Sequence, residues 1–331
     1  MVDSSLPLSS SAASSPGEES EDTSAWFPYL YDTHCHIVDD APEHYARVSE
    51  LRTSRLCLMS AKPEDWSLVA LLARAHPSKV RPAFGVHPWY ADQVHTATTT
   101  VSGDDDAKPA AGEMTGGTDE PPQPLWWIQT LRMQLQAFPD AVVGEIGNRL
   151  DRAAKDPKTG QIYDAAQQMR AFTAQWSLAA ELGRPVSIHC VRRHGAFVDH
   201  LLECARMPDH RWPPSVVMHA YTGSADTAHR LLALERTLAR RSPALQPVPR
   251  FYFSLSSAIH GGRGSARTTA WVSAVPEDRL LLETDIHRVQ DIDAYMVDAC
   301  RMAAQLNGSG VPAAVIAQRT WQNALAALAE P

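Results

Sequence analysis

The 331-residue sequence contains few cysteines and arranges none of them in C-x-x-C pairs. The five cysteines are scattered, at positions 35, 57, 190, 204 and 300. A disulfide-bonded scaffold is built from an even set of cysteines at regular spacings, and it forms in an oxidising compartment. The odd number and the scatter therefore argue against a disulfide framework and favour a reducing compartment.

The chain also lacks an excess of basic residues and a long apolar run. It has 30 Lys and Arg against 38 Asp and Glu, a formal net charge of -8. Proteins that bind nucleic acid through general phosphate attraction are usually basic, so a nucleic-acid contact here must be a local site. Bound cations can supply the positive charge of such a site. No run is long enough to span a bilayer, and the N-terminus lacks the basic start and apolar stretch of a signal peptide. We expect a protein of the cytoplasm, with the nucleus as a second location, and no membrane contact.

Two segments have compositions that cannot form a core. Residues 1–25 are rich in Ser, Ala, Glu and Asp, and residues 95–124 are polar, acidic and rich in Gly, Thr and Pro. Such segments bury too little apolar surface to offset the entropy lost on ordering. We predict a disordered N-terminal tail and a flexible acidic insertion on the surface, with residues 26–331 forming one domain. Either segment could bind a protein partner.

Short apolar runs alternate with helical patterns along the rest of the chain. The eight runs are residues 30–36, 55–60, 80–87, 141–147, 185–190, 215–220, 251–257 and 279–285. Clear helical segments are residues 168–183, 293–308 and 311–330, the first two ending at glycine. Strands that alternate with helices form parallel βα units, and eight of them indicate a (β/α)8 TIM barrel. An open doubly wound sheet is the competing architecture, but its glycine-rich phosphate loop after the first strand is absent.

Histidines and carboxylates stand at the C-terminal ends of five of these runs. They are His34, His36, Glu145, His189, His219 and Asp285. The strand ends of a barrel share one face, where catalytic residues gather. Residues two apart in a strand point to the same side, so His34 and His36 project together. Charged groups facing a barrel interior need a partner, and Zn²⁺, Mn²⁺ or Mg²⁺ would satisfy imidazoles and carboxylates without thiolates.

Each of these residues also has a plain structural interpretation. A lone histidine at a strand end is more often a hydrogen-bonded core or surface residue, and a lone glutamate often only ends a strand. The H-x-H spacing of His34 and His36 is a stronger signal but is weak alone. The six residues together, at the same end of the predicted strands, favour a metal centre.

Several motifs in order carry a family resemblance. They are "DTHCH", "FGVHP", "VVGEIG", "ELGRPVSIHC", "VVMHAYTGS" and "RLLLETD", and "WQNALAAL" is similar to a closing helix. Together they resemble the TatD family of metal-dependent deoxyribonucleases, which are amidohydrolase-like barrel hydrolases. The resemblance runs from about Leu30 to about Leu328 and implies hydrolysis of phosphodiester bonds in DNA, at ends or in single strands.

The resemblance also implies a site with two divalent metal ions. His34 and His36 would hold one ion with Asp285, Glu145 would bridge the two, and His189 and His219 would hold the second. His87 would contact a substrate phosphate. We also expect Glu145 and Asp285 to be catalytic, with Asp285 accepting the proton of the attacking water. Glu283 either orients an imidazole or forms a salt bridge at the barrel wall.

The substrate side departs from the family pattern. The usual continuation of "GEIG" is Leu-Asp-Tyr, whereas here Asn148 and Arg149 come first and Leu150 and Asp151 follow them. Trp89 stands where a histidine is usual, and Val191 replaces an arginine. These departures leave the metal centre intact and put the identity of the substrate in question.

Several neighbouring residues are candidates for substrate binding. Arg192 and Arg193 could clamp a phosphate or lie in a solvated loop. The backbone N–H groups of Tyr221 to Ser224 could form an anion pocket at a helix start. Trp89 and Tyr90 could stack on a base or pack in the core.

Three functions therefore remain open. The first is a metal-dependent nuclease that acts on DNA. The second is a hydrolase of another ester or amide, such as a small phosphodiester or an aminoacyl-tRNA, since the same metal centre polarises a carbonyl. The third is a barrel that acts mainly by binding a protein partner. We expect a monomer.

Overall fold

The computed structural model describes residues 22–96, 126–147, 164–241, 248–261, 265–308 and 310–329. Its strands are β1 Tyr31–Cys35, β2 Arg55–Met59, β3 Val80–Phe84, β4 Val142–Gly147, β5 Val186–His189, β6 Ser215–Met218, β7 Arg250–Ser256 and β8 Leu280–Glu283. Each lies within one of the eight apolar runs or begins one residue before it. The described strands form one eight-stranded sheet, in which every strand pairs in parallel with the next one in sequence.

The last strand returns to the first. The N–H of Asp285 donates to the carbonyl of His34 at 2.9 Å, and the N–H of His36 donates to the carbonyl of Ile286 at 2.9 Å. Deeper in the barrel, the hydroxyl of Thr33 donates to the carbonyl of Leu282 at 3.0 Å. These bonds bring β8 beside β1, so the sheet curls into the predicted TIM barrel with its strand ends on one face.

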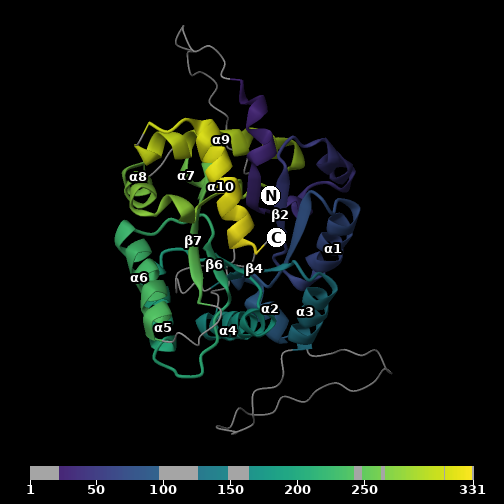
Figure 1. The fold of residues 1–331 in the computed structure, drawn as a ribbon. Coiled ribbons are helices and arrows are strands. Elements are labelled where there is room, and N and C mark those ends of the chain that lie inside the picture. Colours follow the sequence, from purple (N-terminus) through teal and green to yellow (C-terminus); the bar gives the residue numbers. More distant parts are fainter. Residues whose placement is uncertain are drawn as a thin grey trace, which may run out of the picture.

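Helices surround the strands (Figure 1). They are α1 Trp66–Ala75, α2 Ala91–Thr96, α3 Trp126–Ala137, α4 Ala165–Leu182, α5 His194–Cys204, α6 Ala225–Arg241, α7 Ser257–His260, α8 Ser265–Ala274, α9 Ile292–Asn307 and α10 Ala313–Ala327. The predicted glycine stops are correct: Gly183 and Gly308 follow α4 and α9 with φ of 65° and 68°, a left-handed conformation that glycine adopts without steric cost. Pro312 immediately precedes α10, where a proline costs no hydrogen bond.

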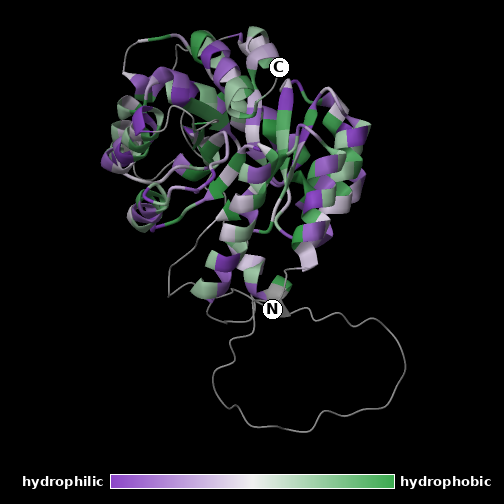
Figure 2. Ribbon diagram, turned by 60° about the horizontal axis from the view of Figure 1, so that its bottom comes forward, coloured by the Kyte–Doolittle hydropathy of each residue, from purple (hydrophilic) through white to green (hydrophobic). Residues whose placement is uncertain are grey.

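Apolar side chains form two layers. The larger layer lies between the outer face of the strands and the helices, and it includes Leu56, Phe84 and Val143. A smaller cluster fills the barrel, with Tyr31, Cys57 and Leu281 among its members, and it includes Ala327 and Leu328 at the end of α10. Figure 2 shows the same pattern, with hydrophobic residues concentrated in the strands and both hydrophobic and hydrophilic residues on the surrounding helices.

The predicted tail and insertion lie mostly outside the described residues. Residues 1–21 and 97–124 are not described, whereas residues 95 and 96 end α2. The N-terminal boundary differs from the prediction, because Thr23–Ala25 form a short 3-10 helix. The side chain of Asp22 accepts a hydrogen bond from the N–H of Ser24 at 2.9 Å. Trp26, which follows, is buried in the core, so the ordered chain begins before residue 26. No helix in the described ranges is long and apolar enough to cross a membrane.

Candidate metal centre

The ends of β1 and β8 are joined by one buried carboxylate, that of Asp32. It accepts hydrogen bonds from the N–H of Thr284 at 2.9 Å, the hydroxyl of Thr284 at 2.6 Å and the N–H of His34 at 3.2 Å. Burial raises the pKa of Asp32 to about 7, although the bonds from Thr284 act in the opposite direction. Asp285 follows Thr284 directly and has a φ of 58°, a left-handed conformation that costs a non-glycine residue about 1–2 kcal/mol. Asp32 therefore fixes the turn that brings Asp285 beside the histidines of β1.

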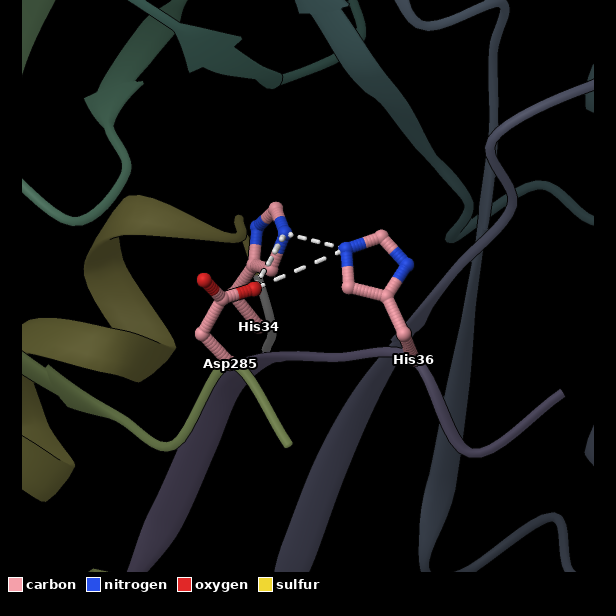
Figure 3. Close-up of side chains that lie close together, drawn as sticks. All are labelled: His34, His36 and Asp285. Atoms are coloured by element: carbon pink, nitrogen blue, oxygen red, sulfur yellow. Dashed lines mark hydrogen bonds and ion pairs between the residues drawn. The ribbon is translucent and has the colours of Figure 1, made fainter. Parts of the chain in front are cut away.

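One half of the site gathers around Oε2 of Glu145, on β4. Nε2 of His34 lies 3.1 Å from Nε2 of His36, and these two atoms lie 3.4 and 3.2 Å from Oε2 of Glu145. Oδ1 of Asp285 completes the group, at 3.9 Å from His34 and 3.7 Å from His36. Figure 3 shows His34, His36 and Asp285 converging from β1 and from the segment after β8. Ligands about 2.0–2.1 Å from a tetrahedral ion lie about 3.4 Å from one another, so the spacing fits one ion.

The other half of the site faces Oε1 of the same glutamate. Nδ1 of His189 lies 2.6 Å from this oxygen, Nε2 of His219 lies 3.3 Å from it, and Nε2 of His87 lies 3.5 Å from it. The two carboxylate oxygens thus face two different sets of imidazoles. His34, His36 and Asp285 form one candidate group for a divalent metal, and Glu145 and His189 with His87 form another.

Burial and close contacts shift the pKa values of the groups in the site. Burial would raise the pKa of Glu145, but the imidazoles of His87 and His219 hold it well below its usual range. The rings of His34 and His219 stack with centroids 3.7 Å apart. Burial and the neighbouring His219 lower the pKa of His34, whereas the carboxylates of Glu283 and Glu145 outweigh burial and raise the pKa of His219 well above its usual value. Nε2 of His189 is buried and has no hydrogen-bond partner among the described residues. Imidazole and carboxylate donors, without thiolate, suit Zn²⁺, Mn²⁺ or Mg²⁺.

Polar side chains behind the histidines orient their rings. Oε1 of Glu283 lies 3.0 Å from Nδ1 of His219 and accepts the N–H of Ala220 at 2.6 Å. Oγ of Ser187 lies 3.0 Å from Nδ1 of His34. Each contact leaves the Nε2 atom of its histidine facing Glu145, as expected for a carboxylate or hydroxyl that fixes a metal-binding ring. Of the two interpretations of Glu283, the structure confirms the one in which it orients an imidazole.

A backbone hydrogen bond indicates which ring nitrogen of His87 carries the proton. Its Nδ1 accepts a hydrogen bond from the N–H of Trp89 at 3.1 Å, so in the neutral ring the proton is on Nε2. Burial lowers the pKa of His87 well below its usual value. In this tautomer Nε2 of His87 carries a hydrogen, lies 3.5 Å from Oε1 of Glu145 and has no free lone pair for a metal ion. This geometry agrees with a role beside the metal centre.

The segment that carries His87 is braced by α4. The side-chain amide of Gln175 accepts the N–H of Val86 at 2.7 Å and donates to the carbonyl of Val86 at 3.1 Å. Gln168, two turns earlier on the same face of α4, donates to the carbonyl of Pro88 at 3.1 Å. Both glutamines are fully buried. They hold the β3 loop against the barrel.

A cavity of about 150 Å³ opens onto this centre. It is lined by five of the six predicted ligands, together with His87, Asp39, Trp89, Tyr90 and His287. Nδ1 of His287 lies 2.9 Å from Oδ2 of Asp39, and its ring stacks on that of His36 with centroids 5.4 Å apart. The sixth ligand, His34, lies beneath the others and is fully buried.

Three predicted substrate contacts lie elsewhere among the described residues. The Tyr221 side chain is buried, packs against Phe253 and donates its hydroxyl to the carbonyl of Ser224 at 2.8 Å. The N–H of Tyr221 also has a protein partner, the carbonyl of Ser254 at 3.1 Å. Arg193 precedes α5 as its N-cap residue, and Arg192 is exposed with a φ of 58°. The described lining of the cavity contains none of the three.

Sequence reasoning missed Asp32, Ser187 and the pair of Asp39 and His287. Asp32 stands two residues before His34, so the alternation of side chains along the strand would have placed it on the same side as His34. Ser187 stands two residues before His189 in the same way. The contact of Asp39 with His287 joins residues 248 apart, and no local pattern indicates it.

Comparisons with known proteins agree with this geometry. The model of the TatD related DNase family matches residues 31–329. The chain belongs to this family. The expectation from the sequence motifs is thus confirmed, and the family match covers the whole barrel.

Individual TatD relatives match at low identity over most of their length. The chain is 28% identical to the Cut9-interacting protein scn1 of Schizosaccharomyces pombe, over 80% of this chain and 88% of the relative. It is 26% identical to the 3'-5' ssDNA/RNA exonuclease TatD of Erwinia tasmaniensis, over 76% of each chain. The crystal structure of a TatD homologue from Escherichia coli superposes with a TM-score of 0.63 at 21% identity, over 91% of this chain and 98% of that one. That likeness supports the fold.

Proposed function

We propose that this protein is a divalent-metal-dependent nuclease that hydrolyses phosphodiester bonds in DNA, at ends or in single strands. One observation carries the proposal: the two oxygens of Glu145 face two separate sets of imidazoles, at 3.2–3.4 Å on one side and 2.6–3.5 Å on the other. A pair of cations bridged by a carboxylate is a common arrangement in enzymes that cleave phosphodiesters.

The ligand atoms divide between two ions in the following way. His34, His36 and Asp285 with Oε2 of Glu145 would hold one, and His189 and His219 with Oε1 would hold the other. Bound Mg²⁺, Mn²⁺ or Zn²⁺ would activate water and neutralise the charge that develops on the phosphate. Glu283 and Ser187 keep the imidazoles of His219 and His34 in position for this.

Asp285 is the residue best placed to accept the proton of the attacking water. Its side chain is 19% exposed, whereas that of Glu145 is 3% exposed. A carboxylate that reaches both the centre and the solvent can receive a proton and release it to bulk water. Nε2 of His87 lies 3.5 Å from Oε1 of Glu145, so its N–H would help to orient this carboxylate between the two ions.

The experiment that tests the proposal uses an end-labelled single-stranded oligonucleotide. The protein is incubated with it in Mg²⁺, Mn²⁺ or Zn²⁺, with and without chelator, beside a Glu145→Ala variant. We expect shortening that needs the metal and is lost in the variant. Metal binding without cleavage of any DNA or RNA would contradict the nuclease proposal and leave the metal centre.

The same centre could act on another ester or amide. The departures at Trp89, Asn148 and Val191 favour this alternative, since they alter the residues expected around the substrate. A panel of small phosphodiesters, amides and aminoacyl-tRNA, assayed under the same metal conditions, separates the two. Hydrolysis of one of these at a rate well above that of the oligonucleotide would favour the alternative.

A role in binding a protein partner has one supporting observation. A relative of 28% identity is named for its interaction with the protein Cut9. Deleting residues 97–124 should abolish partner capture and spare oligonucleotide cleavage if the chain acts through a partner. If cleavage falls and a defined partner is still bound, the segment serves the enzyme.

A further inference from the structure

The mouth of the cavity has two unlike sides. On one side the ring of His287 stacks on His36 and pairs with the carboxylate of Asp39. On the other side stands the indole of Trp89, with its centroid 4.7 Å from that of His87 and 6.3 Å from that of His189. A hydrogen-bonded pair of Asp39 and His287 therefore borders the His36 half of the centre, and an uncharged aromatic ring borders the His189 half.

Trp89 is unusual because it is large, apolar and exposed at a site. Its relative exposure is 40%, while most tryptophans in the described residues are buried. The sequence places it rigidly: Pro88 begins a 3-10 turn, and the N–H of Trp89 donates to Nδ1 of His87 at 3.1 Å. Gln168 fixes the carbonyl of Pro88 from behind, at 3.1 Å. The indole is thus held at the rim before any ligand arrives, which lowers the entropy lost on binding.

The size of the cavity decides what Trp89 can contact. Its volume of about 150 Å³ is below the ~300–1,000 Å³ of pockets that enclose a drug-sized ligand. A phosphate and part of one sugar fit beside the centre, so the base must lie at the rim. Every base has a π-face, and stacking on an aromatic side chain is the usual way that single strands are bound. Lys62 lies 5.5 Å above the ring of neighbouring Tyr90, which adds a cation on this side for a second phosphate.

We propose that Trp89 is the stacking platform for the base of the nucleotide whose phosphate enters the metal centre, and that it selects unpaired nucleotide ends as substrate. The proposal rests on the proposed nuclease function and narrows it. A base that stacks on Trp89 has left its neighbour and its pairing partner, which costs least at a single-stranded end. Trp89 is therefore a specificity-determining residue, and the uncharged ring accepts any of the bases.

The test is a cycle that pairs a variant with a changed substrate. Trp89→Ala and wild type are assayed on an end-labelled single strand and on the same strand with an abasic terminal residue, placed at each end in turn. The matched control is Trp126→Ala, because Trp126 begins α3 and is similarly exposed at 46%. Fluorescence anisotropy of the same labelled strands measures binding without cleavage.

If the base stacks on Trp89, removing the indole and removing the base should weaken binding by the same amount, and removing both should weaken it no further. On the normal end, Trp89→Ala should raise KM about tenfold with kcat within about twofold, since stacking contributes equally to ground and transition states. When the abasic residue is at the end that binds at the centre, wild type should show the same rise in KM. Trp89→Ala should show no further rise in KM on that strand. Trp89→Phe should recover most of the loss, and Trp126→Ala should behave as wild type.

Two outcomes would overturn the proposal. Equal losses for Trp89→Ala on normal and abasic ends would show that Trp89 only supports His87, and an unchanged KM would show no contact. If wild type cleaves neither strand, the proposed function is wrong. The anisotropy measurement then tests separately whether Trp89 binds the base. Binding that is equal for normal and abasic ends, or equal for wild type and Trp89→Ala, would contradict the stacking platform.

Discussion

The two ends of the barrel differ in their side chains. At the C-terminal ends of the strands, imidazoles and carboxylates face one another across a cavity. At the N-terminal ends, apolar side chains are covered by the end of α10. Tyr31, Cys57 and Leu281 pack there against Ala327 and Leu328. Both ends contain buried charge. At the α10 end, the guanidinium of Arg81 is 4% exposed and donates to the carbonyl of Leu328.

The partners of the buried charges differ between the two ends. A cation at the C-terminus of a helix is stabilised by the helix dipole and by orphan carbonyls, so Arg81 has a structural partner. Glu145 instead faces imidazoles from four other strands or their loops, at 2.6–3.5 Å. A buried charge that is hydrogen-bonded to the backbone, as Arg81 is, stabilises the fold. A cluster of buried ionisable side chains, as around Glu145, is a candidate site for a ligand. The variants that follow should separate these two kinds of charge.

The largest effect is expected at Glu145. Glu145→Gln keeps the shape and removes the charge that both halves of the centre share. We expect kcat/KM on the oligonucleotide to fall by more than about 100-fold, beyond the usual effect of losing a residue that only orients a ligand. Isothermal titration with Mn²⁺ should show weakened binding, and circular dichroism should show an unchanged fold. A loss below tenfold would contradict the bridging role.

A smaller effect is expected when the orientation of one ligand is lost. Glu283→Gln weakens the hold on Nδ1 of His219, and such changes cost about 10–100-fold in metal affinity or activity. The matched control is Glu277→Gln at the other end of the barrel, where the carboxylate pairs with Arg319 at 2.8 Å. Metal titration and steady-state kinetics of both variants give the comparison. Equal effects would mean that Glu283 only contributes to stability.

At the α10 end the expected effect is on folding. Arg81→Met removes the charged donor to the carbonyl of Leu328 and retains an apolar side chain of similar length. Hydrogen bonds to charged groups contribute about 1.5–3 kcal/mol, so the free energy of unfolding in urea should fall by about 1.5 kcal/mol. Below the denaturation range, kcat/KM should stay within about twofold of wild type. A large loss of activity at unchanged stability would break the distinction between the two ends.

The smallest effect is expected at Arg192. This residue is exposed and does not line the described cavity, so it acts on a polyanionic strand through solvent. Exposed charges contribute about 0.2–1 kcal/mol, and salt screens them. Arg192→Ala should raise KM by no more than about fivefold at low salt, and the difference should vanish at high salt. A larger loss that persists in salt would restore the phosphate clamp predicted from the sequence.

Most of the barrel was predictable because its signals are local. A parallel strand buried on both faces is a continuous apolar run, so "SVVM" in β6 and "LLLE" in β8 are visible without any partner. A polar residue directly after such a run, as His219 is, must lie at the strand end. The helix stops at Gly183 and Gly308 are local in the same sense.

The rest depends on contacts that no local pattern contains. Tyr221 follows His219 closely, and its position in the sequence therefore suggested a contact with substrate. Its ring instead packs in the core against Phe253 and Trp271. Asp32 gains its role only through Thr284, which lies 252 residues away. The protonated nitrogen of His87 follows from one backbone hydrogen bond, which sequence reasoning could not supply.

We propose that Glu145 bridges two cations. The direct measurement is an anomalous difference map from a crystal equilibrated with Mn²⁺. Two peaks about 3.5–4 Å apart are expected, one beside His34, His36 and Asp285 and the other beside His189 and His219, with Glu145 between them. A single peak at saturating Mn²⁺, or no peak within reach of Glu145, would contradict the account.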